Sequence, residues 1–194
     1  MTDTPLPAHN DAGNLAGVAH PTRVRILAIL RTDGPTTATA LAARLGLNSG
    51  ATSYHLRQLA EHGFVVDDPE RGNRRERWWK AAQDNTAPPV DGQLADDTGL
   101  GVAYLRSIAL VQSDNMQAAV DALPALPAKW RAPFDLSDYV IRLTPEGAAA
   151  LGAELHAVLR RHAAQAPPLQ DPAEGTARVT VQLQMFPDLG DADR

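Results

Sequence analysis

Residues Thr36–His62, TTATALAARLGLNSGATSYHLRQLAEH, constrain the fold more than any other stretch of this chain. Their pattern predicts two short amphipathic helices separated by a tight break at Gly46-Leu47-Asn48, where glycine suits the residue that ends a helix. In the second helix Thr52, Leu56 and Leu59 are spaced i, i+4 and i+7, so they lie on one helical face. Two such helices joined by such a break predict a helix-turn-helix unit.

The opposite face of the second predicted helix displays small and hydrogen-bonding side chains, with one cation. Its members are Ser49, Gly50, Ser53, Tyr54 and Arg57. A helix that lies in the DNA major groove needs such a face, because small residues let the backbone approach and polar ones reach base edges and phosphates. We therefore predict that these five residues form the DNA-reading face of a recognition helix.

The elements on either side fit the same architecture. A helix is predicted at His20–Asp33, with Pro21 in its first turn and Gly34-Pro35 at its end. Behind the recognition helix, extended segments at 64–68 and 74–80 flank a Pro/Gly/Asn turn, which predicts a β-hairpin. A hairpin that directly follows a helix-turn-helix is a wing.

The tip of the predicted wing is basic. The candidate DNA-binding residues there are Arg71, Asn73, Arg74 and Arg75. Cations held at a wing tip can meet phosphates or the minor groove beside the recognition helix. The alternative is a solvated turn that is basic by chance.

The charge distribution supports this interpretation better than the total charge does. The net charge of −5 argues against nucleic acid at first. However, Pro21–Lys80 carries ten Lys and Arg against six Asp and Glu, whereas residues 81–194 carry eight against fifteen. A mildly basic segment joined to an acidic remainder suits a DNA-reading module attached to a different module. Ordinary scatter of surface charge is the alternative.

From His20 to Lys80, about a third of the chain, the sequence resembles the ArsR-like winged helix-turn-helix repressors of bacteria. The matching stretches are HPTRVRILAIL, LAARLGLNSGATSYHLRQLAEHGFV and DDPERGNRRERWWK. The resemblance implies a homodimer that binds double-stranded DNA, usually a repressor released by an effector. Many members sense metals through Cys or His/Asp pairs. This chain has no cysteine, and TATALAARL in its second helix offers no ligand, so we expect neither a metal site nor a cofactor.

The C-terminal half predicts a different module. Thr98–Leu123 is a long helical pattern that is apolar on more than one face, which favours packing against a partner chain; the alternative is the central helix of its own domain. Leu136–Leu143 and Arg178–Phe186 alternate like half-buried strands on either side of a helix from Thr144 to about Ala163. We expect these strands to pair with each other, and helix cover or a partner's strands to complete the sheet, because two strands alone are marginal. Two roles stay open for this unit, binding of an apolar small-molecule effector or dimerisation and stability alone.

The sequence thus predicts an α+β fold in which a winged helix-turn-helix domain precedes a long dimerisation helix and a small two-strand α+β unit. The expected divisions are a mobile arm at 1–17, the winged domain at 18–82, a linker at 83–97, the dimerisation or effector domain at 98–187 and a tail at 188–194.

The expected function is sequence-specific DNA binding in transcriptional control, and the alternative is a winged helix that binds protein, for which an apolar wing tip would be more typical. The chain has no GxSxG, P-loop or dinucleotide glycine pattern, so we expect no enzyme and no catalytic residues. No apolar run approaches the roughly 18–20 residues that span a bilayer, and the first residues lack a signal-peptide pattern. We therefore expect a cytoplasmic protein that does not enter a membrane.

Overall fold

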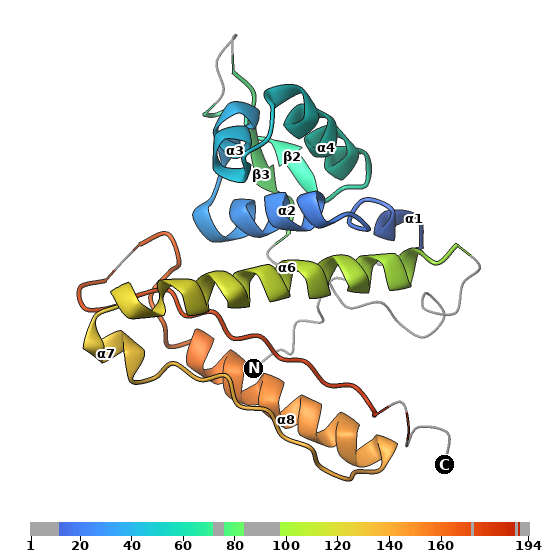
Figure 1. The fold of residues 1–194 in the computed structure, drawn as a ribbon. Coiled ribbons are helices and arrows are strands. Elements are labelled where there is room, and N and C mark those ends of the chain that lie inside the picture. The colour runs from blue at the N-terminus through green and yellow to red at the C-terminus, as the bar shows by residue number, and fades with distance from the viewer. Residues whose placement is uncertain (1–11, 72–75, 84–97, 172, 189, 191–194) are drawn as a thin grey trace. The chain divides into compact units, whose positions relative to one another are not determined.

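The structure is a computed structural model that describes residues 12–71, 76–83, 98–171, 173–188 and 190. The chain divides into two compact units, residues 1–121 and 122–194. Figure 1 labels most of their elements, and each unit is considered by itself below.

The first unit contains the predicted helix-turn-helix. Its elements in chain order are α1 (Ala12–Leu15), α2 (Pro21–Asp33), β1 (Thr36–Thr37), α3 (Ala38–Leu45), α4 (Ser49–Glu61), β2 (Val65–Asp67), β3 (Trp78–Ala81) and α6 (Leu100–Ala122). The break between α3 and α4 forms because Gly46 takes a left-handed conformation with a φ of 65°, which costs a glycine little. Asn48 then begins α4, since its side chain accepts a hydrogen bond from the backbone N–H of Ala51 at 2.7 Å.

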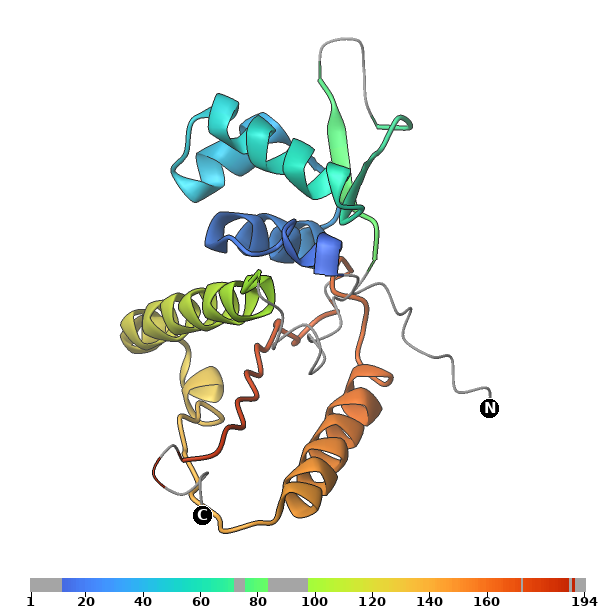
Figure 2. The same cartoon turned by 90° about the vertical axis from the view of Figure 1, so that its right-hand side faces the viewer.

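The predicted wing is confirmed, and it belongs to a three-stranded antiparallel sheet in the order β1-β3-β2. In the hairpin Val65 lies opposite Ala81 and Asp67 lies opposite Trp79. The short strand β1, which the sequence pattern does not predict, pairs with the other edge of β3, so that Thr36 lies opposite Trp79. Figure 2 shows the hairpin next to the end of α4 where the chain leaves that helix.

One apolar cluster holds the first unit together. Its buried members are Leu15, Val18, Ile26, Leu27, Leu30, Leu41, Leu56, Leu59, Phe64, Val65, Trp79 and Tyr104. The inward face predicted for the recognition helix is confirmed, because Thr52, Leu56 and Leu59 are each 0% exposed. Full burial of a side chain the size of leucine is worth about 1.5–3 kcal/mol, so this cluster fixes how α4 is presented.

The prediction of a mobile arm at residues 1–17 is wrong for its last residues. Helix α1 occupies Ala12–Leu15, and the side chain of Leu15 is fully buried. Gly17 lies so close to α4's end that a Cβ placed on it would be 2.5 Å from the Cβ of His62. A single helical turn leaves no periodicity for a sequence pattern to detect. Residues 1–11 lie outside the described residues.

Helix α6 confirms the predicted long helix, and all of it except Ala122 belongs to the first unit, whereas the sequence led us to expect a separate domain from residue 98. Tyr104 joins the apolar cluster, and Ser107 and Val111 are buried on the same side of the helix. Arg25 of α2 also forms an ion pair with Asp114 of α6. The linker expected at 83–97 lies outside the described residues except for Gln83, whose carbonyl accepts a hydrogen bond from Arg31 Nε at 2.9 Å.

The second unit contains η1 (Leu123–Ala125), α7 (Ala128–Arg131) and α8 (Pro145–Ala163). Thr144 caps α8 as the sequence indicates, since its hydroxyl accepts a hydrogen bond from the N–H of Gly147 at 3.1 Å. The two strands predicted at 136–143 and 178–186 are wrong, because neither segment forms a strand in the structure. Alternation indicates a covered face, but a strand also needs a second strand beside it.

In the part of the chain that the structure describes, no helix combines the length and the apolar character needed to cross a bilayer.

Candidate nucleic-acid interface

The outward face of α4 is the centre of the candidate interface. Ser49 and Gly50 are exposed in its first turn, where the Asn48 cap begins the helix. One turn further, Ser53 is half-buried and Tyr54 is 53% exposed, and Arg57 is exposed beyond them. The structure therefore brings all five predicted residues to one solvent-facing side of the helix.

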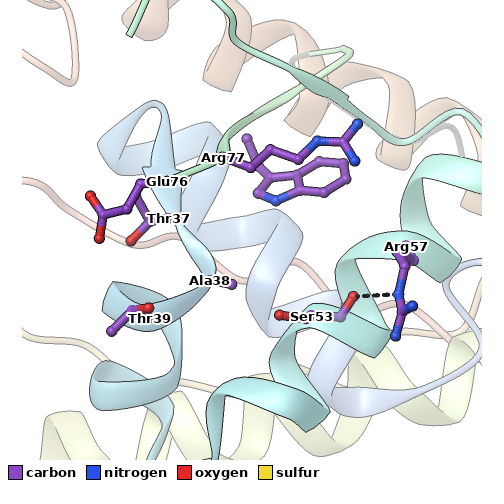
Figure 3. Close-up of a pocket in the computed structure, with 8 residues that line it drawn as sticks. Thr37, Ala38, Thr39, Ser53, Arg57, Glu76 and Arg77 are labelled. Carbon is purple, nitrogen blue, oxygen red and sulfur yellow. Dashed lines mark hydrogen bonds between the residues drawn. The ribbon is translucent and has the colours of Figure 1, made fainter. Parts of the chain in front are cut away.

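Two of these residues open onto a surface cavity of about 410 Å³, which Figure 3 shows in close-up. Its walls come from the start of α3, from α4 and from the β3 side of the wing. The lining residues are Thr37, Ala38, Thr39, Ser53, Arg57, Glu76, Arg77 and Trp79. The recognition helix and the wing thus share one hollow, although they are 20 residues apart in the sequence at Arg57 and Arg77.

The cations at this hollow are held by defined contacts. Arg57 Nε donates a hydrogen bond to the carbonyl oxygen of Ser53 at 3.3 Å. Arg77 Nε pairs with Asp67 Oδ2 at 3.0 Å, and its guanidinium carbon lies 4.2 Å from the centre of the Trp79 ring. Stacking on an aromatic face and a carboxylate partner restrict a long side chain that is otherwise 58% exposed.

Sequence reasoning missed Arg77, although a signal was present. Arg77 and Trp79 are two residues apart in an extended segment, and side chains with that spacing share one face of a strand. The prediction concentrated on the tip of the hairpin and did not follow this alternation toward its base.

A buried carboxylate directly follows β2, on the side of the hairpin that leads to the wing tip. Asp68 is only 5% exposed and lies 3.6 Å from Lys80 Nζ and 3.9 Å from Arg71 Nε. Arg71, the first predicted wing residue, keeps a side chain that is 61% exposed. The other three predicted wing residues, Asn73, Arg74 and Arg75, lie outside the described residues.

Behind the recognition face, two histidines join α4 to α2. The rings of His20 and His55 are 4.8 Å apart, and His20 Nδ1 accepts a hydrogen bond from the N–H of Thr22 at 3.1 Å. Burial lowers the pKa of His55, and the nearby His20 and Arg23 lower it further. Burial and Arg23 likewise lower the pKa of His20. Both rings are therefore neutral at pH 7, so the contact between His20 and His55 places no histidine charge behind α4.

The described residues contain no group of three or more His, Asp or Glu side chains that could hold a metal ion. The chemistry of this surface is that of hydrogen-bond donors and cations on a helix and a hairpin. Such a surface can bind a polyanion and offer polar contacts to the edges of its bases.

Comparison with known proteins agrees with this geometry. Residues 18–67, about a quarter of the chain, match the family model of a helix-turn-helix domain. No curated protein matches the chain. The matched range includes α2, α3 and α4 and ends within the first strand of the wing.

Proposed function

We propose that this chain is a sequence-specific DNA-binding transcriptional regulator of the ArsR-like type, a homodimeric repressor that acts by binding rather than by catalysis. The observation that carries the proposal is the shared hollow, onto which Ser53 and Arg57 of the recognition helix and Arg77 of the wing all open. The helix-turn-helix match at residues 18–67 supports the same function.

In this proposal α4 and the wing contact different parts of the DNA. Helix α4 enters the major groove, where Arg57 has the reach and the donor geometry to contact a guanine edge. The wing lies along the phosphate backbone, where Arg71 and Arg77 neutralise charge together with the predicted tip residues. Backbone contacts set the position of the protein, and base contacts set its sequence preference.

A homodimer is part of the proposal because α6 carries an apolar stripe on the side away from its core. Val102, Leu105, Met116 and Val120 are 38–43% exposed, and their spacing places them on one helical face. A second copy that covers this stripe would present two recognition helices to two DNA half-sites. Repression follows if the operator overlaps a promoter, because the bound dimer then excludes the polymerase.

A small-molecule effector that acts through residues 98–187 stays a prediction. A thermal-shift screen followed by a DNA-release assay tests it, because a true effector stabilises the protein and lowers its affinity for the operator. If no compound does both, the module serves dimerisation and stability alone.

The function is tested by fluorescence anisotropy with the DNA upstream of the chain's own gene and with a scrambled duplex of equal length. We expect the specific duplex to bind at least about 10³-fold more tightly, and both affinities to fall as salt rises from about 50 to 200 mM. Absence of any salt-sensitive binding would contradict the proposal and favour a winged helix that binds protein.

A further inference from the structure

The wing hairpin carries an ion pair on each of its two faces. Asp67 lies opposite Trp79 in the register of β2 and β3, and it pairs with Arg77 on the face that borders the hollow. Successive side chains of an extended chain point to opposite faces, so Asp68 belongs to the other face, called here the outer face. There its Oδ1 lies 3.6 Å from the Nζ of Lys80. The hollow accounts for Arg77 but not for this second pair.

The ion pair on the outer face is built around a buried acid. Asp68 is only 5% exposed, whereas the side chains of Lys80 and Arg71 are 46% and 61% exposed. The backbone of Asp68 is also fixed, because its N–H donates to the carbonyl oxygen of Trp78 at 2.8 Å and its own carbonyl oxygen accepts from the N–H of Arg71 at 3.3 Å. The carboxylate is therefore a fixed point beside two cations that are open to solvent.

The distances show that the carboxylate does not use up the donors of these cations. Asp68 Oδ1 is 3.6 Å from Lys80 Nζ and Asp68 Oδ2 is 3.9 Å from Arg71 Nε, and both distances exceed the length of a hydrogen bond. Charge alone thus holds the cations here, and their N–H groups remain able to donate to an external anion. Ion pairs with exposed cations add little to the stability of a fold, so this arrangement suits binding better than folding.

We propose that Asp68 is a positioning residue, which holds Lys80 and Arg71 together on the outer face of the wing so that they bind a phosphate of the DNA backbone. The proposal rests on the DNA-binding function proposed above. It adds a phosphate contact on the face of the wing opposite Arg77. Without the carboxylate between them, the two cations would repel each other instead of meeting one anion.

The position of the hollow indicates which backbone each face of the wing meets. When α4 lies in the major groove and the wing points into the minor groove, one sugar-phosphate backbone runs between them. The hollow lies between these same two elements, with Arg57 and Arg77 on its walls. The outer face is turned away from the hollow and therefore meets the backbone on the far side of the minor groove. The two faces of the wing thus contact the two strands of the duplex.

Lysine substitutions in the full chain test the contact by fluorescence anisotropy. Lys80→Ala should reduce the slope of log affinity against log salt by about 0.9 on specific and scrambled duplexes alike, so that the loss of affinity between about 50 and 200 mM salt becomes about threefold smaller. Lys80→Arg keeps the charge and should keep the slope. The matched control is Lys129→Ala, which removes an exposed lysine from α7 and should leave the slope unchanged. A slope for Lys80→Ala equal to that of the unmodified chain would overturn the proposal.

Asp68→Asn separates positioning from simple repulsion of the phosphates. Asparagine has nearly the same shape and keeps both backbone hydrogen bonds, but it lacks the charge that holds the cations. A positioning role predicts that the slope falls to the level of Lys80→Ala, although the protein has lost a negative charge. A higher affinity and a steeper slope would mean that Asp68 only repels DNA, and would overturn its positioning role. Circular dichroism checks the fold, and the Lys80 variants decide the proposal if Asp68→Asn is unfolded.

A double substitution tests whether the two faces meet different phosphates. Separate contacts predict that the slope decreases of Lys80→Ala and Arg77→Ala add to about 1.8 in the double variant. A decrease no larger than that of either single variant would overturn the two-strand arrangement. An unmodified chain without salt-dependent DNA binding would overturn the proposed function as well. Salt-dependent binding that Lys80→Ala leaves unchanged would overturn only the contact on the outer face.

Discussion

The two units of this chain use apolar residues in opposite ways. In residues 1–121 apolar side chains of α1, α2, α3, α4, α6 and the hairpin meet in one cluster, and Leu15, Leu56 and Leu59 are fully buried. In residues 122–194 none of the described residues is buried, although Tyr139, Ile141 and Val181 are as apolar as the core of the first unit.

The difference shows that helices and strands place different demands on a single chain. Whether their apolar side chains can be buried depends on where the backbone groups find hydrogen-bonding partners. A helix satisfies its own backbone and needs a neighbour only for its apolar stripe, which α2, α3 and α4 supply to one another. A strand needs a neighbour for its backbone as well. In the first unit β3 has β1 and β2 on its two edges, whereas the segments at 136–143 and 178–186 have no strand beside them.

The largest expected effect follows from this contrast in burial. Leu56→Ala removes a fully buried side chain from the centre of the first unit and should lower the free energy of unfolding by about 2–5 kcal/mol. The control in the second unit is Leu169→Ala, because that side chain is 52% exposed. This substitution should change the free energy of unfolding by less than about 0.5 kcal/mol. Urea unfolding followed by circular dichroism measures both, and equal losses would break the comparison.

The next effect concerns DNA rather than stability. Arg57→Ala should lower the affinity for the specific duplex by about 1–3 kcal/mol if this arginine reads a base. The affinity for random DNA should fall much less. Arg160→Ala on α8 is the matched control, since it removes an exposed helical arginine from the second unit. Equal losses on specific and random DNA would mean that Arg57 contacts only the backbone of the duplex.

The elements that the sequence predicts correctly are those whose signals are local. Asn48 and Thr144 each form the cap that their residue type favours, and Gly46 ends α3 in the left-handed conformation. The i, i+4, i+7 spacing in α4 likewise needs no information from elsewhere in the chain. These signals suffice for the helix-turn-helix, the hairpin and α8.

The features that the sequence pattern did not predict depend on distant neighbours. Strand β1 forms because β3 offers an edge more than 40 residues away, and Leu15 is buried because the core leaves room for it. Arg77 joins the recognition helix at one hollow only through the fold of the sheet. The absent strand pair in the second unit has the same cause, because alternation in a sequence does not say which strand supplies the hydrogen bonds.

A smaller effect distinguishes the wing from the recognition helix within the first unit. Arg77→Ala should weaken binding to specific and random DNA by similar factors and reduce the slope of log affinity against log salt by about 0.9, the value for one phosphate contact. Arg77→Lys keeps the charge and should restore most of the slope, although it loses the planar stacking on Trp79. A loss confined to the specific duplex would assign Arg77 to base reading instead.

The smallest expected effect is a pH dependence that belongs to the first unit. Because the pKa values of His20 and His55 are lowered in the folded protein, these groups bind protons more readily after unfolding. The contact between the two neutral rings therefore contributes its full stability above pH 6.5, the ordinary pKa of histidine. This contribution is lost as the pH falls from 6.5 toward the lowered pKa values of the folded protein. The hydrogen bond from Thr22 to His20 Nδ1 acts in the same direction, since a protonated Nδ1 cannot accept it.

His20→Asn isolates this contribution, because asparagine still caps α2 but does not titrate. We expect the free energy of unfolding of the unmodified chain to fall between pH 7 and pH 5, and that of His20→Asn to fall less over the same range. Urea titrations at both pH values provide the measurement. An identical decrease in the two proteins would show that His20 is not the source of the acid sensitivity.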